Sequence, residues 1–190
     1  MFYMNITVFY GSSRENSNSS LLANKVLNGL NFEAVHLQNM KIVPIEDKRH
    51  DLEGFSLPDD DYDQIIQQIL KSDVIVFATP IYWYSMSGTM KVMIDRLSQA
   101  IRDERYPQLT EHLRTVKAIV LAVGGDNPTI KGLPMIQQFQ YIFEFLGTSF
   151  EHYILAEGNR PGDVLSDSRV LSEVKWLNGW LQSLVNQTRH

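Results

Sequence analysis

The chain has 190 residues, a formal net charge of −5 and no cysteine. The lack of cysteine excludes disulfides, cysteine-ligated zinc, iron–sulfur clusters and thiol nucleophiles. The acidic balance argues against nucleic acid and against an anionic membrane surface as the main partner, because both select for basic stripes. With 44% hydrophobic and 21% charged residues the composition is globular, and the length predicts one domain, residues 1–190.

Strand and helix patterns alternate from the first residues onward. Residues 4–10 are rich in β-branched and aromatic side chains, and no basic region precedes them, so we expect a first strand rather than a signal peptide. Apolar side chains at helical spacing mark a helix within residues 22–30. Residues 32–37 predict a second strand, 40–60 an extended loop and 62–70 a second helix.

The second half of the chain continues the alternation. The run VIVFAT at residues 74–79 is apolar on both faces, which suits a strand covered by helices on both sides of a parallel sheet. No apolar run approaches the roughly 20 residues that span a bilayer. Further strands are predicted at 116–123 and 150–156, and further helices at 90–97, 135–146 and 171–185.

Five strands in strict alternation with five helices predict an α/β fold. The helices supply the crossovers that parallel strands need, so we expect a doubly wound three-layer sandwich with a five-stranded parallel sheet of order 2-1-3-4-5, the flavodoxin-like arrangement. In such open sheets a ligand binds beyond the carboxyl ends of the strands, at the point where the strand order reverses. The loops after Tyr10, Thr79 and Val123 are therefore the candidate site.

The first of these loops, residues 11–20, is rich in hydroxyls and leads into a helix. Exposed N–H groups at a helix start attract phosphate, and the loop adds polar side chains that could complete an anion cradle: Ser12, Arg14, Ser17, Asn18 and Ser19. The alternative is a polar turn with a simple N-cap. The loop is neither a Walker loop nor the dinucleotide motif G-x-G-x-x-G.

The second and third loops point to a planar ligand. Tyr82, Trp83 and Tyr84 are consecutive, and exposed aromatics at a strand end are costly unless a flat ring, a neighbouring loop or a dimer interface covers them. Gly124 and Gly125 follow a core strand and permit close backbone approach, although glycine there is also typical of a simple turn. A phosphate, a planar ring and a backbone contact together fit flavin mononucleotide (FMN).

Two segments resemble the NAD(P)H-dependent FMN reductase family. Residues 11–19 resemble its phosphate loop G-S-x-R-x-x-S-N-[TS], and residues 80–96 resemble its segment P-x-Y-x-x-x-[MP]-[ST]-[GA]-x-x-K-x-x-[IL]-D-R. Ser13 stands where many members have proline, and the compact cysteine motif of the iron–sulfur branch is missing, so the resemblance implies a flavin-only member. It implies that the phosphate is held by Ser12, Arg14, Ser17, Asn18 and Ser19, and that the isoalloxazine is bordered by Pro80, Ile81, Tyr82, Trp83, Ser85, Gly124 and Gly125.

The resemblance also implies an activity. We expect a cytoplasmic homodimer or homotetramer in which NADPH or NADH reduces FMN, and a small molecule such as a quinone, azo or nitro compound, ferric chelate or free flavin accepts the electrons. The flavin does the chemistry, so we assign no catalytic side chain. Lys91 and Asp95 are interpreted as a helical i, i+4 pair, and Asp95 together with Arg96 as the anchor of the helix. The acidic run 59–61 is interpreted as helix-start charge rather than a metal site.

Two other functions share this fold. A flavodoxin-type electron carrier would need a protein partner, and Arg14 together with the moderate charge favours the reductase over it. A regulatory flavin-binding module is the second alternative. The sequence leaves open whether Arg14, Lys131 or Arg160 selects the nicotinamide, and whether residues 102–109 form a surface loop or a lid that reaches a partner subunit.

Overall fold

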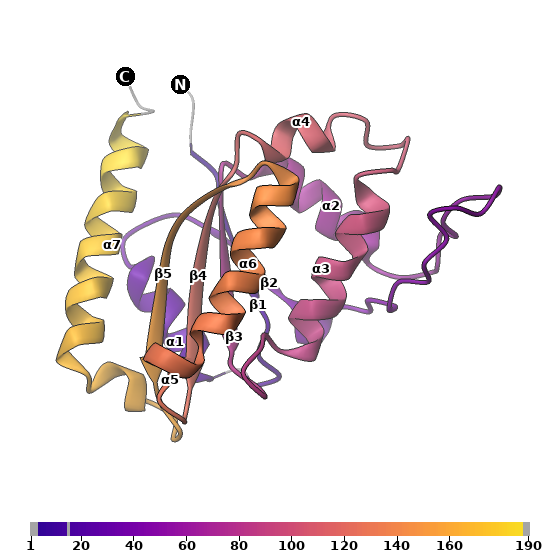
Figure 1. Cartoon of the computed structure of the whole chain (residues 1–190). Coiled ribbons are helices and arrows are strands. Elements are labelled where there is room, and N and C mark those ends of the chain that lie inside the picture. The colour runs from indigo at the N-terminus through magenta and orange to yellow at the C-terminus, as the bar shows by residue number, and fades with distance from the viewer. Residues whose placement is uncertain (1–3, 15, 188–190) are drawn as a thin grey trace.

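The computed structural model describes residues 4–14 and 16–187. Its single sheet has five parallel strands in the order β2-β1-β3-β4-β5, which confirms the predicted flavodoxin-like doubly wound fold (Figure 1). The strands are β1 (Ile6–Tyr10), β2 (Glu33–His36), β3 (Val74–Pro80), β4 (Lys117–Gly124) and β5 (Ser149–Glu157). The helices are α1 (Asn18–Val26), α2 (Tyr62–Lys71), α3 (Gly88–Ala100), α4 (Leu109–Leu113), α5 (Pro128–Lys131), α6 (Leu133–Leu146) and α7 (Ser168–Gln187), with 3-10 turns at Leu37–Asn39 and Asp163–Leu165.

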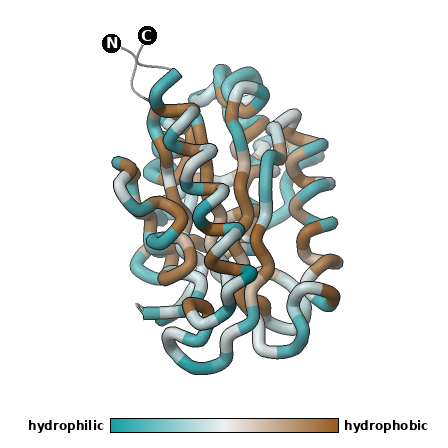
Figure 2. Tube along the Cα trace, turned by 90° about the vertical axis from the view of Figure 1, so that its left-hand side faces the viewer, coloured by the Kyte–Doolittle hydropathy of each residue, from teal (hydrophilic) through white to brown (hydrophobic). Residues whose placement is uncertain are grey.

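Two hydrophobic cores lie on opposite faces of the sheet. Along β3, Val74, Val76 and Ala78 pack against α1 and α7, whereas Ile75 and Phe77 pack against α2, α3 and α6. Successive side chains of a strand point to opposite faces, so a strand covered on both sides must be apolar at every position. Figure 2 shows that strand segments in the interior of the molecule are largely hydrophobic.

Two short helices add to the five that the sequence predicts. Helix α4 follows the 102–108 turn and buries Leu109 and Leu113, and α5 forms a single turn after Asn127. Each is too short to show a helical period in the sequence. In β4 and β5 the register shifts between Ala118 and Ile119, which is a β-bulge that the sequence pattern does not reveal.

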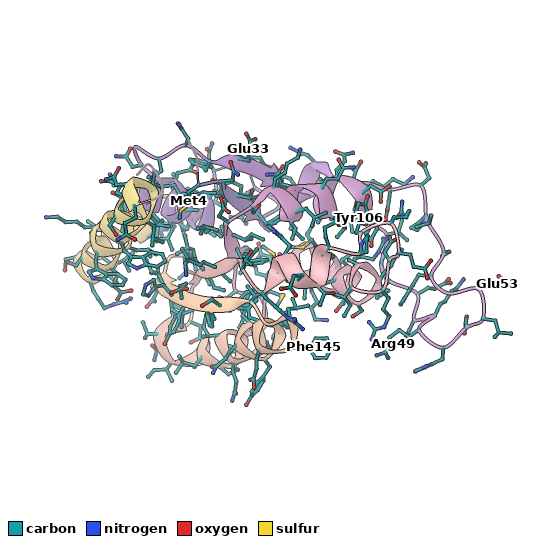
Figure 3. The ribbon with its side chains drawn as sticks, turned by 90° about the horizontal axis from the view of Figure 1, so that it is seen from above. Met4, Glu33, Arg49, Glu53, Tyr106 and Phe145 are labelled. Carbon is teal, nitrogen blue, oxygen red and sulfur yellow. The ribbon has the colours of Figure 1, made fainter. Side chains whose placement is uncertain are left out.

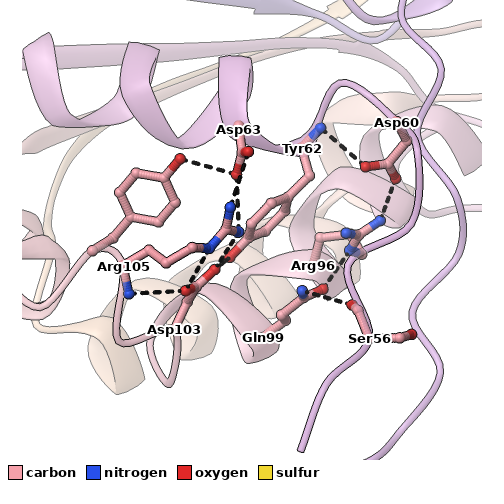
Figure 4. Close-up of polar contacts among 9 residues, drawn as sticks. Ser56, Asp60, Tyr62, Asp63, Arg96, Gln99, Asp103 and Arg105 are labelled. Carbon is pink, nitrogen blue, oxygen red and sulfur yellow. Dashed lines mark hydrogen bonds and ion pairs between the residues drawn. The ribbon is translucent and has the colours of Figure 1, made fainter.

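The segment 102–109 is held against α2 in this chain. Arg105 donates to Asp63 at 3.0 Å and, through two nitrogens, to Asp103, while the Tyr106 hydroxyl donates to Asp63 at 2.9 Å (Figure 4). The hydroxyl of Tyr62 adds a bond to Asp103 at 3.1 Å. Of the two alternatives left by the sequence, these contacts favour a fastened surface loop.

The loop between β2 and α2 extends away from the sheet (Figures 1 and 3). Its return to the fold is fixed by an ion pair in which Arg96 Nη1 donates to Asp60 at 2.5 Å, with side-chain exposures of only 4% and 0% (Figure 4). Of the predicted Asp95–Arg96 anchor only Arg96 takes this role, because Asp95 pairs with Lys91 on the same helix. Asp60 also accepts from the backbone N–H of Tyr62 at 3.2 Å. Lys91 and Asp95 form the expected i, i+4 ion pair at 2.6 Å.

Candidate functional site

The first two candidate loops are joined at Gly11, where β1 ends. Its N–H donates to the Ala78 carbonyl at 2.8 Å, and its carbonyl accepts from the Ser87 hydroxyl at 2.6 Å. Ser87 is also the N-cap of α3 and accepts from the Met90 N–H. A Cβ at position 11 would lie 2.9 Å from Ser87 Oγ and 3.0 Å from Met90 Cε, so this junction needs glycine.

A cluster of buried hydroxyls begins helix α1. Ser17 is the N-cap, and its Oγ accepts from the Ser20 N–H at 3.1 Å and lies 3.1 Å from Ser19 Oγ and 2.8 Å from Ser20 Oγ. Ser12 is also buried, and its hydroxyl accepts from the Arg14 N–H at 3.1 Å. The first turn of α1 carries no acidic residue. The cap and the anion cradle are therefore compatible, because the hydroxyl cluster lies at the start of the helix, where the first N–H groups have no partner within the helix.

Asn18 connects this helix start to the loop after β5. Its amide nitrogen donates to the Arg160 carbonyl at 2.8 Å, and its amide oxygen accepts from the Gly162 N–H at 2.9 Å. The side chain thus braces a fourth loop, which was not among the three loops predicted to form the site. The predicted strand order could have indicated this loop, because β5 is the neighbour of β4 and its carboxyl end therefore reaches the same edge of the sheet.

The aromatic residues of the second loop form a tight turn. Tyr82 and Ser85 exchange two backbone hydrogen bonds at 3.0 and 3.1 Å, and between them Trp83 and Tyr84 have φ angles of 49° and 64°. Positive φ at both central positions is the type I′ geometry, which favours glycine and asparagine. Bulky side chains there cost of order 1–3 kcal/mol each and such strain is common at functional sites. The turn exposes 94% of Trp83.

The second and third loops are held together by backbone and side-chain bonds. The Ile81 N–H donates to the Val123 carbonyl at 2.8 Å. The Tyr84 hydroxyl donates to Asp126 at 2.9 Å, and Lys131 Nζ donates to the same carboxylate at 2.7 and 2.8 Å. The Lys131 ammonium, and secondly the Tyr84 hydroxyl, lower the pKa of Asp126 below its usual value. The carboxylate is therefore ionised at neutral pH and fixes the turn.

The loops line two adjoining hollows at this edge of the sheet, here treated together as the hollow. Its larger part, about 300 Å³, is lined by Ser12, Arg14, Asn16, Ser17, Asn18, Ser19, Pro80, Ile81, Tyr82, Val123, Gly124, Gly125, Gly158, Asn159 and Pro161. A smaller part, about 160 Å³, shares Ile81, Gly124 and Gly125 and reaches Trp83, Tyr84, Asp126, Pro128, Lys131 and Gly132. Among the residues predicted to bind FMN, only Ser85 lines neither part, and its hydroxyl donates to Gln138 on α6 at 2.9 Å.

The hollow suits a nucleotide with a planar ring. One end presents hydroxyls and helix N–H groups, the other presents aromatic rings, and Gly125 lets the Asn159 side chain approach where a Cβ would stand only 1.7 Å from its Oδ1. Among the described residues no group of three or more His, Cys, Asp or Glu side chains is arranged to hold a metal ion. Likewise, no helix in residues 4–14 and 16–187 has the length and apolar character to cross a membrane.

Comparison with known proteins identifies relatives of this chain. The family model described as NADPH-dependent FMN reductase matches residues 4–140. The Bacillus subtilis (strain 168) protein YwqN, named as an NAD(P)H-dependent FMN-containing oxidoreductase, is 52% identical over 169 residues, covering 89% of this chain and 93% of that protein. An FMN-dependent NADH:quinone oxidoreductase of Stenotrophomonas maltophilia (strain K279a) is 33% identical over 107 residues, about half of either chain (52% of each).

Two solved structures share the fold of this chain. A Bacillus subtilis structure described as Trp repressor binding protein superposes with a TM-score of 0.77 at 45% identity, covering 90% of this chain and 96% of that one. A Bacillus anthracis azoreductase shares the fold, with a TM-score of 0.67 at 16% identity over 93% of this chain and 99% of that one. The predicted class of activity, an FMN-dependent NAD(P)H oxidoreductase, is confirmed at the level of the family. With its fold, its phosphate-loop motif and these matches, the chain belongs to the NADPH-dependent FMN reductase family.

Proposed function

We propose that the hollow between the strand-end loops is the FMN site of an NAD(P)H-dependent reductase whose electron acceptor is a small quinone-like molecule. The observation that carries this is the placement of a buried hydroxyl cluster at one end of the hollow and three aromatic side chains at the other. FMN, when bound, supplies hydride acceptance from the nicotinamide and electron transfer to the acceptor. The quinone class is supported by the names of the relatives with 33% identity.

The chain's own residues bind and orient the cofactor in this proposal. Ser12, Ser17 and Ser19 offer hydroxyls to the phosphate, and Arg14 adds a positive charge at the mouth of the hollow. Asn18 contributes by bracing the loop at Arg160. Helix α1 contributes its free N–H groups.

The opposite end of the hollow receives the ring system. Pro80, Ile81, Gly124 and Gly125 form its walls, and Tyr82 and Trp83 lie at its open side, with Ser85 supporting the turn from α6. Reductant and acceptor would enter in turn beside these rings. No side chain is assigned a proton-transfer role.

The contacts of three basic residues bear on which of them would bind the 2′-phosphate that distinguishes NADPH from NADH. Lys131 is neutralised by its two bonds to Asp126, so it offers little free charge to a 2′-phosphate. Arg14 and Arg160 form no ion pair among the described residues; Arg14 lines the larger part of the hollow, and Arg160 lies between two of its lining residues, Asn159 and Pro161. We therefore propose one of these two arginines as the contact that would distinguish NADPH from NADH.

The decisive experiment compares FMN with riboflavin, which lacks the phosphate. Arg14→Ala is expected to weaken FMN binding about tenfold or more, as expected for loss of a charge-assisted bond, with little effect on riboflavin. Lys25→Ala, in the last turn of α1, is the matched control. If the two ligands lose affinity equally, the phosphate assignment is wrong.

Anaerobic stopped-flow absorbance then tests the activity. NADPH or NADH alone should bleach the FMN-loaded protein, and a benzoquinone should restore the colour. Bleaching only in the presence of a separate reductase protein would favour the electron-carrier alternative. We also propose a homo-oligomeric assembly and a cytoplasmic location. The location is supported by the sequence, which contains no cysteine, because proteins of oxidising compartments commonly carry disulfides.

A further inference from the structure

The loop that follows β5 has a fixed backbone at Asn159. The N–H of the preceding residue, Gly158, donates to the Gly124 carbonyl on β4 at 2.9 Å. The N–H groups of Asn159 and Arg160 both donate to one carboxylate oxygen of Asp163, at 3.1 and 2.7 Å. The backbone on both sides of Asn159 is therefore held, first by the sheet and then by the turn.

The Asn159 side chain, in contrast, leaves most of its hydrogen-bonding capacity unused within the chain. Its nitrogen donates to the Gly125 carbonyl at 3.5 Å, which is longer than the usual range for such a bond. Its oxygen accepts no hydrogen bond from a described residue. A carboxamide offers two donor hydrogens and an acceptor oxygen with two lone pairs, so both lone pairs and one hydrogen remain available to another molecule.

Two glycines make room for this arrangement. A Cβ at position 125 would stand 1.7 Å from Asn159 Oδ1 and 2.6 Å from its Cγ, so any other residue there would displace the carboxamide. A Cβ at position 158 would lie 2.8 Å from Asn18 Nδ2. The glycines thus let the β5 loop approach β4 on one side and the start of α1 on the other.

The position of Asn159 is between the two ends of the hollow, and Asn159 lines its larger part. On one side its neighbour Gly158 adjoins Asn18 at the start of α1, the end that carries the hydroxyl cluster. On the other side its carboxamide adjoins Gly125, in the wall assigned to the ring system. A ligand with a phosphate at α1 and a ring beside Gly125 therefore passes its connecting chain along Asn159.

Few other side chains can serve the middle of such a ligand. Among the described residues that line the larger part of the hollow, those outside the loop 12–19 with a polar side chain are Tyr82 and Asn159. Tyr82 belongs to the exposed turn at the open side. Within the loop, the Asn18 carboxamide is already bonded through both its nitrogen and its oxygen.

We propose that Asn159 binds the ribityl chain of FMN, an inference that rests on the flavin site proposed above. The hydroxyls of a ribityl chain lose water when the flavin enters the hollow, and they need new partners there. A carboxamide both donates to and accepts from hydroxyls. Because the backbone at Asn159 is already fixed, the contact forms with little further loss of backbone entropy. Asn159 thus recognises the sugar-alcohol chain of the flavin, separately from the phosphate.

Two flavins that differ only in this chain test the contact. The first is FMN, and the second is a synthetic analogue in which a phosphopentyl chain without hydroxyls replaces the phosphoribityl chain. In fluorescence titrations of the full chain, Asn159→Ala should raise the dissociation constant for FMN about five- to tenfold, the effect of one or two neutral hydrogen bonds. The constant for the analogue should stay unchanged. Equal losses for the two flavins, or no loss for FMN, overturn the inference.

Two controls separate binding from structure. Asn186→Ala, at an exposed asparagine near the end of α7, should change neither dissociation constant. The flavin-free Asn159→Ala protein should melt at the wild-type temperature, because the side chain makes a single long bond within the described chain. A Tm several degrees lower would show that Asn159 supports the loop instead, and would also overturn the inference.

The glycine at position 125 provides an independent check. Gly125→Ala displaces the carboxamide, so it should add little to the loss of FMN affinity that Asn159→Ala already causes. Fully additive losses would contradict a shared contact with the ribityl chain. A wild-type protein that binds neither flavin would refute the proposed flavin site itself, whereas tight FMN binding that is indifferent to Asn159 would refute this contact alone.

Discussion

Replacing Arg96 with methionine should destabilise the fold strongly, because it leaves the Asp60 carboxylate buried without its cation. Removing one partner of a buried pair costs about 3–5 kcal/mol. Asp60 keeps two backbone donors, the N–H groups of Val43 and Tyr62. We therefore expect about 3 kcal/mol, near the lower limit of that range. For a chain of this size the loss corresponds to a Tm lowered by about 6–12 °C.

Urea denaturation of the wild type, Arg96→Met, Asp60→Asn and the double variant measures the coupling. The double variant should recover more than half of the loss, because no unpaired charge remains and one nitrogen, Nη2 of Arg96, is already unsatisfied in the native protein. Lys91→Met breaks an exposed pair on the same helix and should cost under about 0.5 kcal/mol. An Arg96→Met loss below about 1 kcal/mol, or strictly additive single losses, would refute the reasoning.

Substitutions at three further positions address the site and the pH dependence of stability. Ser17→Ala should lower the unfolding free energy by about 1 kcal/mol through loss of the N-cap. Ser17→Asp should keep the cap but repel phosphate, so fluorescence titration should show weaker FMN binding than for Ser17→Ala; the opposite order would contradict a phosphate contact. Gly125→Ala displaces Asn159 and should raise the FMN dissociation constant about tenfold, whereas Gly179→Ala, with open space around it, should leave that constant unchanged. Burial raises the pKa of Tyr10 to about 12. The unfolded chain therefore loses this proton first as pH rises, and stability should fall between about pH 10 and pH 12. In Tyr10→Phe, denaturation at successive pH values should show a smaller fall, and an unchanged slope would exclude Tyr10 as its source.

Much of the fold follows from hydrophobic patterning. Strand β3 is apolar at five consecutive positions, residues 74–78, because both of its faces are covered, and that single observation already implies a parallel sheet with helices on either side. The bulge was not predictable, because its extra residue, Glu151 of β5, is distinguished only by having no register partner on β4, which the sequence of β5 alone does not show. Helix α5 was missed because one turn has no period to detect. The single-domain interpretation stays a prediction.

The sequence predicted which loops form the site, but it did not predict the side-chain contacts that hold these loops together. Fold logic selected the ends of β1, β3 and β4, and the structure brings them together. The role of Asn18 as a brace could not be deduced, because its partners Arg160 and Gly162 lie about 140 residues away in the sequence (separations of 142 and 144). The Tyr84–Asp126 bond likewise depends on a tertiary turn that puts an aromatic residue in the left-handed region.

The left-handed Trp83–Tyr84 pair limits how this protein can be engineered. Asparagine followed by glycine would adopt the same hairpin without steric conflict, so a screen for heat tolerance alone would reward that exchange. The exchange would also delete both rings from the mouth of the hollow. Thermal robustness and ligand recognition are therefore opposed at these two positions, and a directed-evolution campaign would have to score both properties at once.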